Sequence, residues 1–129
     1  MTYENLISMT NSAEEFVTEE NTALALRSGN LKVFATPALI RLIEEAAAEL
    51  VEKNISPELT SVGISLDVKH TSPTPLGMKV RAEVKIISVE GRKLTFDVVV
   101  YDERGEIARG SHERFIVYKE KFQSKADAK

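Results

Sequence analysis

The apolar residues of this chain change their period once, and that change limits what the chain can fold into. From Pro37 to about Lys53 they recur with the 3.6-residue period of an amphipathic helix. Pro57 follows soon after and ends the helix, because proline cannot continue its hydrogen-bond ladder. Beyond it, apolar and polar residues alternate as in strands over residues 63–70, 78–89, 93–101 and 107–118.

One helix and four consecutive antiparallel strands indicate an α+β fold in which the helix covers one face of the sheet. A further strand with an acidic, exposed side is expected over residues 12–20, which makes the sheet one of about five strands. Residues 21–27 are expected to form one or two helical turns, closed by residues 28–30. The polar tail of residues 119–129 is expected to fray or to form a short terminal helix.

Two apolar runs exceed what a single helix can cover. The runs VVVY (residues 98–101) and FIVY (residues 115–118) are typical of strands that are buried on both faces. Pairing with another copy of the chain would bury the second face, so we expect a homodimer. The length of 129 residues predicts a single domain over residues 1–129.

Composition excludes several functions. The formal charge of −3 argues against nucleic acid binding, and the lack of cysteine excludes disulfides, thiolate metal sites and a thiol nucleophile. No apolar run approaches the roughly 18 residues of a membrane span, and the N-terminus lacks a signal-peptide layout, so a cytoplasmic protein that binds no membrane is expected. The two histidines are isolated, and no phosphate-binding glycine loop, dinucleotide fingerprint or zinc motif occurs, so we expect no metal and no cofactor.

Glu44 is the charged residue that does not fit the pattern of the helix. At roughly 100° per residue, Arg41, Glu45, Glu49 and Glu52 form one solvated stripe, with the apolar side opposite. Glu44 lies about 80° or more from the three glutamates of that stripe. It is either a rim carboxylate that reaches water or a basic residue of a partner subunit, or a partly desolvated carboxylate suited to catalysis. Spacing alone favours the rim position.

Thr36 stands where the helix begins, directly before Pro37. A threonine at the N-cap followed by proline at the first helical position is a common helix start, so capping is the expected role of Thr36. A reactive hydroxyl remains the alternative, because a helix N-terminus also stabilises an anion or developing negative charge.

His70 is the more informative of the two histidines, since it ends the strand of residues 63–70. Its inward phase is shared with Ile64, Leu66 and Val68. His70 is either a core histidine bonded to a carbonyl group or a general base near neutral pH. His112 lies on a strand of unassigned phase and is expected to be structural. Gly63 either allows a tight turn or offers its N–H as a hydrogen-bond donor.

Three stretches of the chain together resemble a known family: VFATPALIRLIEEAA (residues 33–47), VGISLDVKHTSPTPLGMKV (62–80) and VEGRKLTFDVVVYDERGEIARGSHERFIV (89–117). The Ala-Thr before the helix, the helix glutamate, the H-T-x-x-T-P-x-G loop and the G-[ST]-H-E-R strand occur in order and at matching spacing. The chain thus resembles the hotdog-fold thioesterases, specifically the fluoroacetyl-CoA thioesterase-like family, from about Val33 to Phe122.

The resemblance implies hydrolysis of an acyl-CoA thioester, with Thr36, Glu44 and His70 as the catalytic residues and Gly63 binding the thioester carbonyl. His70 would act as base towards water and acid towards the departing thiolate, and Thr36 would position the carbonyl or the nucleophile. Glu44 would either polarise the attacking group or attack the thioester itself. CoA, as part of the substrate, would lie along a dimer interface. The phosphate-ligand candidates are Lys79, Arg81, Arg92, Arg114 and Lys119.

The chain departs from the fluoroacetyl-specific enzyme before the helix. Where that enzyme has aromatic residues over the acyl pocket, residues 25–32 contain none, which favours a general short- or medium-chain acyl group. Two alternatives remain on the same fold. One is a non-catalytic module that binds or senses acyl-CoA, and the other is an enoyl-CoA hydratase or dehydratase.

Overall fold

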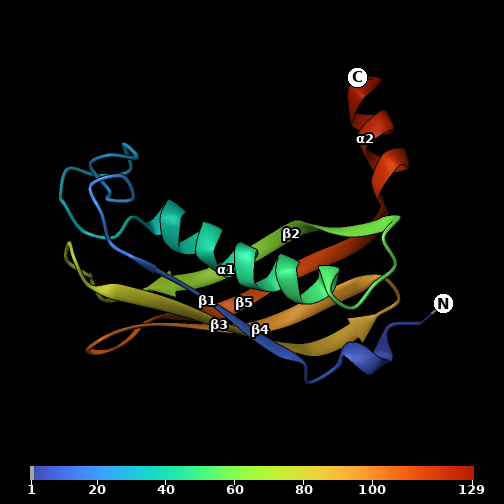
Figure 1. The fold of residues 1–129 in the computed structure, drawn as a ribbon, viewed down its shortest axis with the longest axis horizontal. Helices are drawn as coiled ribbons and strands as arrows, with labels where there is room; N and C mark the ends of the chain where they lie inside the picture. Colours follow the sequence, from blue (N-terminus) through green and yellow to red (C-terminus); the bar gives the residue numbers. More distant parts are fainter. Residues whose placement is uncertain (1) are drawn as a thin grey trace.

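The computed structural model describes residues 2–129, which form one sheet, one long helix and a terminal helix (Figure 1). The elements are η1 Glu4–Leu6, β1 Thr10–Phe16, α1 Thr36–Glu52, β2 Leu59–His70, β3 Lys79–Glu90, β4 Lys93–Asp102, β5 Gly105–Tyr118 and α2 Lys119–Asp127. The five strands are antiparallel to their neighbours, in the order β1-β3-β4-β5-β2. The predicted α+β fold is thus confirmed. Neither helix within residues 2–129 has the length and apolar character needed to span a membrane.

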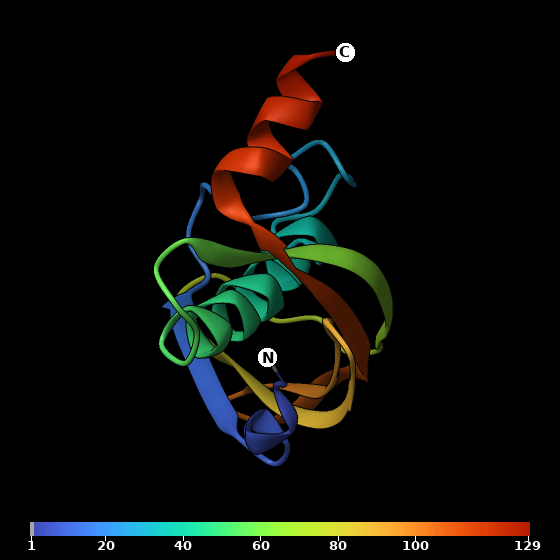
Figure 2. The same ribbon diagram turned by 90° about the vertical axis from the view of Figure 1, so that its right-hand side faces the viewer.

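The sheet curls around α1, which lies against its concave face (Figure 2). The helix buries the side that its periodicity predicted, namely Leu39, Leu42, Ile43, Ala46, Ala47 and Leu50. The strands meet it with alternate residues: Val98 and Val100 of β4 are buried, whereas Val99 between them is only partly buried. In a single chain the apolar run of β4 is therefore fully buried on one face only. In β5 the neighbours Ile116 and Val117 are both buried, whereas Phe115 stays 38% exposed. The homodimer stays a prediction.

The segment before α1 contains a single closed turn of the helical kind that was expected, since the Leu26 amide donates to the Thr22 carbonyl four residues earlier. It does not continue into a helix, and the amides of Ala23 and Leu24 donate across the loop to the carbonyls of Val33 and Leu31. The strand predicted over residues 12–20 is β1, which lies a few residues earlier.

β2 occupies an edge of the sheet. It begins at Leu59, earlier than the alternation predicted, and pairs with β5, whereas β3, the next strand in the sequence, pairs with β1 and β4. Its other edge makes no strand pairing within residues 2–129. An unpaired edge of this length leaves a row of backbone donors and acceptors available to another chain.

A β-bulge divides β2 into two parts that alternate in opposite phase. The register with β5 shifts between Gly63 and Ser65, so Ile64 is the extra residue. Before the bulge, Leu59 and Ser61 are buried; after it the partly buried positions are Leu66, Val68 and His70. Ile64 was predicted to face inward with those three residues, and this was wrong: it is 51% exposed. The bulge turns both Gly63 and His70 towards α1, although their positions differ by seven, which in a regular strand would place them on opposite faces.

The C-terminal tail forms α2, so the expectation of a short terminal helix is confirmed. α2 projects from the end of β5, away from the sheet, in both views (Figures 1 and 2). None of its residues is buried. The helix therefore adds no core and leaves both of its sides accessible.

Candidate active site

Thr36 and His70 form a direct pair between the start of α1 and the end of β2. Thr36 Oγ1 lies 2.9 Å from His70 Nδ1. The predicted capping role of Thr36 was wrong, because Ala35 takes the N-cap position and no side chain there bonds the helix amides. The Thr36 hydroxyl is instead directed at a residue on the neighbouring strand.

The second ring nitrogen of His70 has no partner. His70 Nε2 is buried and makes no hydrogen bond to any part of residues 2–129. Burial lowers the pKa of His70 below its ordinary value, and this outweighs the opposing effect of the Ser72 backbone. The imidazole is therefore neutral near pH 7, with a free nitrogen that can accept or donate one proton.

A cavity of about 260 Å³ adjoins this pair. Its walls come from the turns before α1, including Ala23 and Phe34, and from the loop after β2, including Ser72 and Pro73. The cavity thus combines apolar residues such as Val33 and Phe34 with polar ones such as Ser28 and Thr71, next to the Thr36 hydroxyl and the His70 ring.

Glu44 is held by Arg114 of the same chain. Arg114 Nη1 donates to Glu44 Oε2 at 3.2 Å, and the guanidinium also donates to the hydroxyl of Ser61 at 2.8 Å and to its carbonyl at 3.1 Å. Arg114 is 6% exposed, whereas the side chain of Glu44 is 41% exposed. The carboxylate therefore sits at the edge of a buried cation, with one side open to solvent. Glu45 is the solvated glutamate, as predicted, and pairs with Arg41.

Gly63 lies against the same carboxylate. A β-carbon at Gly63 would stand 2.5 Å from Glu44 Oε2 and 3.4 Å from Arg114 Nη1. The glycine is therefore required by close approach, and its backbone is among the groups nearest to the Glu44 carboxylate.

His112 also belongs to this cluster, a role that the sequence analysis did not predict. His112 is 1% exposed and lies 3.2 Å from Arg114 through its Nε2 atom. The one available signal was the alternation of His112, Arg114 and Ile116, which share the inward face of β5. The face on which His112 lies and the residues that it contacts both depend on the register of β5 with β2, which the sequence does not reveal.

In a single chain the four predicted site residues form two separate groups. Thr36 and Glu44 are eight residues apart on α1, which is about 12 Å along the helix axis. Gly63 and His70 are seven residues apart on β2, or about 20 Å along the strand. The Thr36–His70 pair and the Glu44–Gly63–Arg114 group therefore do not meet within one copy.

The five basic residues predicted to bind CoA phosphates fall into two groups, according to whether they already pair with a carboxylate. Lys79 and Arg81 pair with Glu14 and Glu83, and Arg114 is buried against Glu44, which does not fit a phosphate ligand at the surface.

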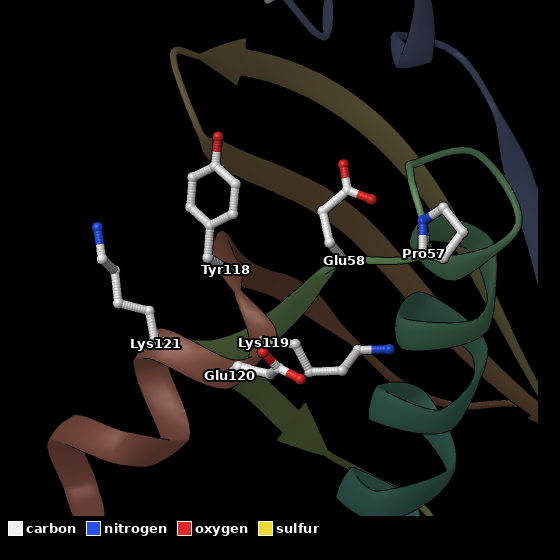
Figure 3. Close-up of a pocket in the computed structure, with 6 residues that line it drawn as sticks. All are labelled: Pro57, Glu58, Tyr118, Lys119, Glu120 and Lys121. Atoms are coloured by element: carbon white, nitrogen blue, oxygen red, sulfur yellow. The ribbon is translucent and has the colours of Figure 1, made fainter.

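Arg92 and Lys119 make no salt bridge within residues 2–129. Lys119 lines a groove of about 420 Å³ with Pro57, Glu58, Tyr118, Glu120 and Lys121 (Figure 3). Arg92 lies over the Tyr118 ring, 5.2 Å from its centroid, beside a smaller hollow against α2. Both cations are thus free at the surface near α2. Within the same residues, no three His, Asp or Glu side chains gather closely enough to hold a metal ion.

The fold is shared with known proteins. A hotdog-like protein from Thermanaerovibrio acidaminovorans superposes with a TM-score of 0.89 at 23% identity, covering 98% of this chain and 95% of that one. The chain is therefore a hotdog-fold protein.

The family follows from closer relatives. The sequence model of the family described as fluoroacetyl-CoA-specific thioesterase matches residues 17–120. The fluoroacetyl-CoA thioesterase of Streptantibioticus cattleyicolor is 37% identical over 98 residues, which is 76% of this chain and 70% of that protein. A structure of the fluoroacetyl-CoA thioesterase FlK superposes with a TM-score of 0.90 at 30% identity, covering 95% of this chain and 96% of that one. The chain belongs to the fluoroacetyl-CoA-specific thioesterase family.

Proposed function

We propose that this protein hydrolyses short- or medium-chain acyl-CoA thioesters to the free acid and CoA. Family membership supports the reaction class. The observation that supports the site is the Thr36–His70 pair, whose His70 ring has a free, buried Nε2 and lines a cavity of mixed apolar and polar residues.

The proposed chemistry assigns one step to each group. His70 takes a proton from a water molecule, which adds to the thioester carbonyl, and later returns the proton to the departing CoA thiolate. The Gly63 N–H stabilises the oxyanion, and loss of one such donor typically costs about 3 kcal/mol, or roughly a hundredfold in rate. Glu44 orients the water rather than attacking, because its ion pair with Arg114 makes the carboxylate a poorer nucleophile.

We further propose that two copies complete each site, which the separation of the two residue groups within one chain supports. β2 offers an unpaired edge, and antiparallel pairing of two β2 strands about a two-fold axis near Leu66 and Asp67 would set His70 opposite the partner's Gly63. The Thr36–His70 pair of one copy would then face the partner's Glu44. This arrangement would make the homodimer a condition of activity.

Mixing two inactive variants tests the shared site. His70→Ala and Glu44→Gln should each be inactive alone. After subunit exchange, mixed dimers hold one site with both residues intact, so an equal mixture should recover about a quarter of wild-type activity. No recovery in a mixture shown to exchange subunits would place each site within one chain.

The activity itself is tested by thiol release over a panel of acyl-CoA esters of increasing chain length. Wild type should show clear turnover that both variants lack. The cavity of about 260 Å³ and the lack of aromatic residues over positions 25–32 favour short and medium acyl groups without selection for fluorine. Tight binding without turnover over the whole panel would contradict the proposal, as would loss of enoyl absorbance without thiol release. The cytoplasmic location stays a prediction.

A further inference from the structure

A chain of polar groups runs behind Glu44 through the interior of the protein. It passes from Glu44 on α1 to Arg114 on β5, then to His112 on the same strand, and ends at the backbone carbonyl of Ser65 on β2. The distances are 3.2 Å from Glu44 Oε2 to Arg114 Nη1, 3.2 Å from Arg114 Nη1 to His112 Nε2, and 2.8 Å from His112 Nδ1 to the Ser65 oxygen. His112 is thus the link between the carboxylate and the backbone of β2.

Only one form of the His112 ring satisfies both neighbours. A guanidinium can donate hydrogen bonds but cannot accept them, so His112 Nε2 has to be the acceptor. A backbone carbonyl can only accept, so His112 Nδ1 has to carry the proton and donate it. The ring is therefore neutral and protonated on Nδ1.

The surroundings of the ring keep it in this position. His112 stacks on Phe96 of β4, with ring centroids 5.8 Å apart and an angle of 28° between the planes. On the other side its Cε1 atom would lie 3.3 Å from a β-carbon at Gly63, so the glycine leaves just enough room for the imidazole. The charged groups nearest to the ring are Arg114, Glu44 and Glu113, of which Glu113 bonds the Ser65 hydroxyl.

The bond to Ser65 anchors the β-bulge. Ser65 is the first residue after the extra residue Ile64, at the point where β2 changes phase. A side chain that holds the Ser65 carbonyl therefore fixes where the phase changes, and with it the orientation of Gly63 and of the residues up to His70.

We propose that His112 is a positioning residue for the active site: as the neutral Nδ1-protonated tautomer it orients Arg114 towards Glu44 and holds the bulge that turns Gly63 and His70 to the same face. The kinetic part of this inference rests on the proposed thioesterase function, whereas the tautomer does not. His112 would touch neither the substrate nor the reacting atoms.

The tautomer is tested on the wild-type protein by nitrogen-15 NMR of the histidine side chains. The chain has two histidines, so His70→Ala leaves only the resonances of His112. We expect the pattern of a neutral ring protonated on Nδ1 that persists below pH 6.5, the ordinary pKa of histidine. A ring protonated on Nε2, or one that titrates at the ordinary value, would overturn the inference even if no substrate were ever found.

Three variants of His112 then distinguish the effect of its bond with Arg114 from the effect of its bond with the Ser65 carbonyl. His112→Leu removes both, His112→Gln places an amide oxygen near the acceptor position of Nε2, and His112→Asn places an amide near the donor position of Nδ1. We expect His112→Leu to lower kcat about tenfold to a hundredfold with KM nearly unchanged, because misplacement by about 1 Å has effects of this size. His112→Gln should recover part of that loss if the contact with Arg114 dominates, and His112→Asn if the bulge does.

A matched control removes a hydrogen bond from the outer side of the same bulge. Ser65→Ala deletes the 2.7 Å bond from the Ser65 hydroxyl to Glu113 and leaves the backbone carbonyl in place. Its kcat should stay within about twofold of wild type, since isolated surface bonds contribute little. A folded His112→Leu variant with wild-type kcat would contradict the positioning role, and an unfolded one would leave the NMR result and the Gln and Asn variants to decide it.

Discussion

The carboxylate of Glu44 lies directly against the backbone of Gly63: a β-carbon on that glycine would stand 2.5 Å from Glu44 Oε2. Gly63 is not among the glycines with a positive φ angle, so the close approach and not the backbone conformation calls for glycine here. The atom that a new side chain would meet first is the end of a flexible side chain. This relationship separates the effect of a substitution on stability from its effect on turnover.

Gly63→Ala should therefore lower turnover far more than stability. We expect the free energy of unfolding to fall by about 1 kcal/mol, since the glutamate can move. Turnover should fall about a hundredfold, because the displaced carboxylate leaves its position against Arg114. Urea unfolding and thiol release measure the two effects.

Gly110→Ala provides the contrast. A β-carbon there would lie 2.0 Å from the backbone oxygen of Asp67, which cannot move independently of β2. Its cost in unfolding free energy should reach about 3 kcal/mol or more. Equal stability losses in the Gly63 and Gly110 variants would contradict this account of the two sites.

Acid should destabilise the protein through its histidines. Burial is the main cause that lowers the pKa of both His70 and His112 in the folded state, whereas the unfolded chain titrates near 6.5. As pH falls below 6.5, the unfolded state therefore takes up protons that the folded state resists, and the free energy of unfolding falls. The stabilising effect of the two neutral rings is fully present above that pH.

Urea unfolding between pH 7.5 and 5.5 measures this loss. Carboxyls with a lowered pKa, such as those of Glu49 and Glu113, act below their ordinary value of 4.5 and so leave this range to the histidines. His112→Gln should flatten the dependence. If the free energy of unfolding depends on pH equally in wild type, His112→Gln and His70→Gln, the histidines are not the cause of the acid destabilisation.

The hydroxyl of Thr36 should matter for catalysis through His70 rather than through the helix. Thr36→Val keeps the shape and removes the bond to His70 Nδ1, whereas Thr36→Ser keeps the hydroxyl. We expect kcat to fall about tenfold to a hundredfold in the valine variant, because the ring loses its fixed orientation, and to recover largely in the serine variant. Equal activity in the valine and serine variants would remove Thr36 from the site.

Arg92 and Lys119 should contribute to binding of the nucleotide end of CoA. The double variant Arg92→Ala/Lys119→Ala removes two cations without acidic partners, and should raise KM for acyl-CoA several-fold, about 1 kcal/mol in binding. The same variant should leave KM unchanged for an acyl N-acetylcysteamine thioester, which lacks the phosphates. Lys79→Ala, which removes a cation already paired with Glu14, is the control. A KM increase for both thioesters would point to a change in the site itself.

Periodicity predicted the elements of this fold because the apolar pattern of a helix or strand is visible within a short stretch of sequence. The buried side of α1 and the alternation along β4 are examples. Periodicity could not predict the bulge in β2, because the extra residue, Ile64, is itself apolar and continues the alternation of Leu66 and Val68. An apolar side chain exposed at an edge looks the same in the sequence as one in the core.

The contacts of the predicted site residues could not be derived from the sequence. Thr36 carries the sequence signal of a helix cap, yet its hydroxyl meets His70, 34 residues away, so a local rule named the wrong partner. The pairing of Glu44 with Arg114 spans 70 residues and depends on which strand lies beside which. Such contacts are fixed by strand order and register, which no local pattern contains.

The bulge also shows which change in length this strand can absorb. Ile64 is the one residue of β2 between Gly63 and His70 that has no partner on β5. Deletion of its codon would leave Gly63 opposite Arg114 and Ser65 opposite Glu113, so the residues from Ser65 to His70 would keep their partners and their faces. His70 would still point at Thr36. A homologue with one residue fewer between Gly63 and His70 would therefore keep the same site, without the exposed apolar side chain of Ile64.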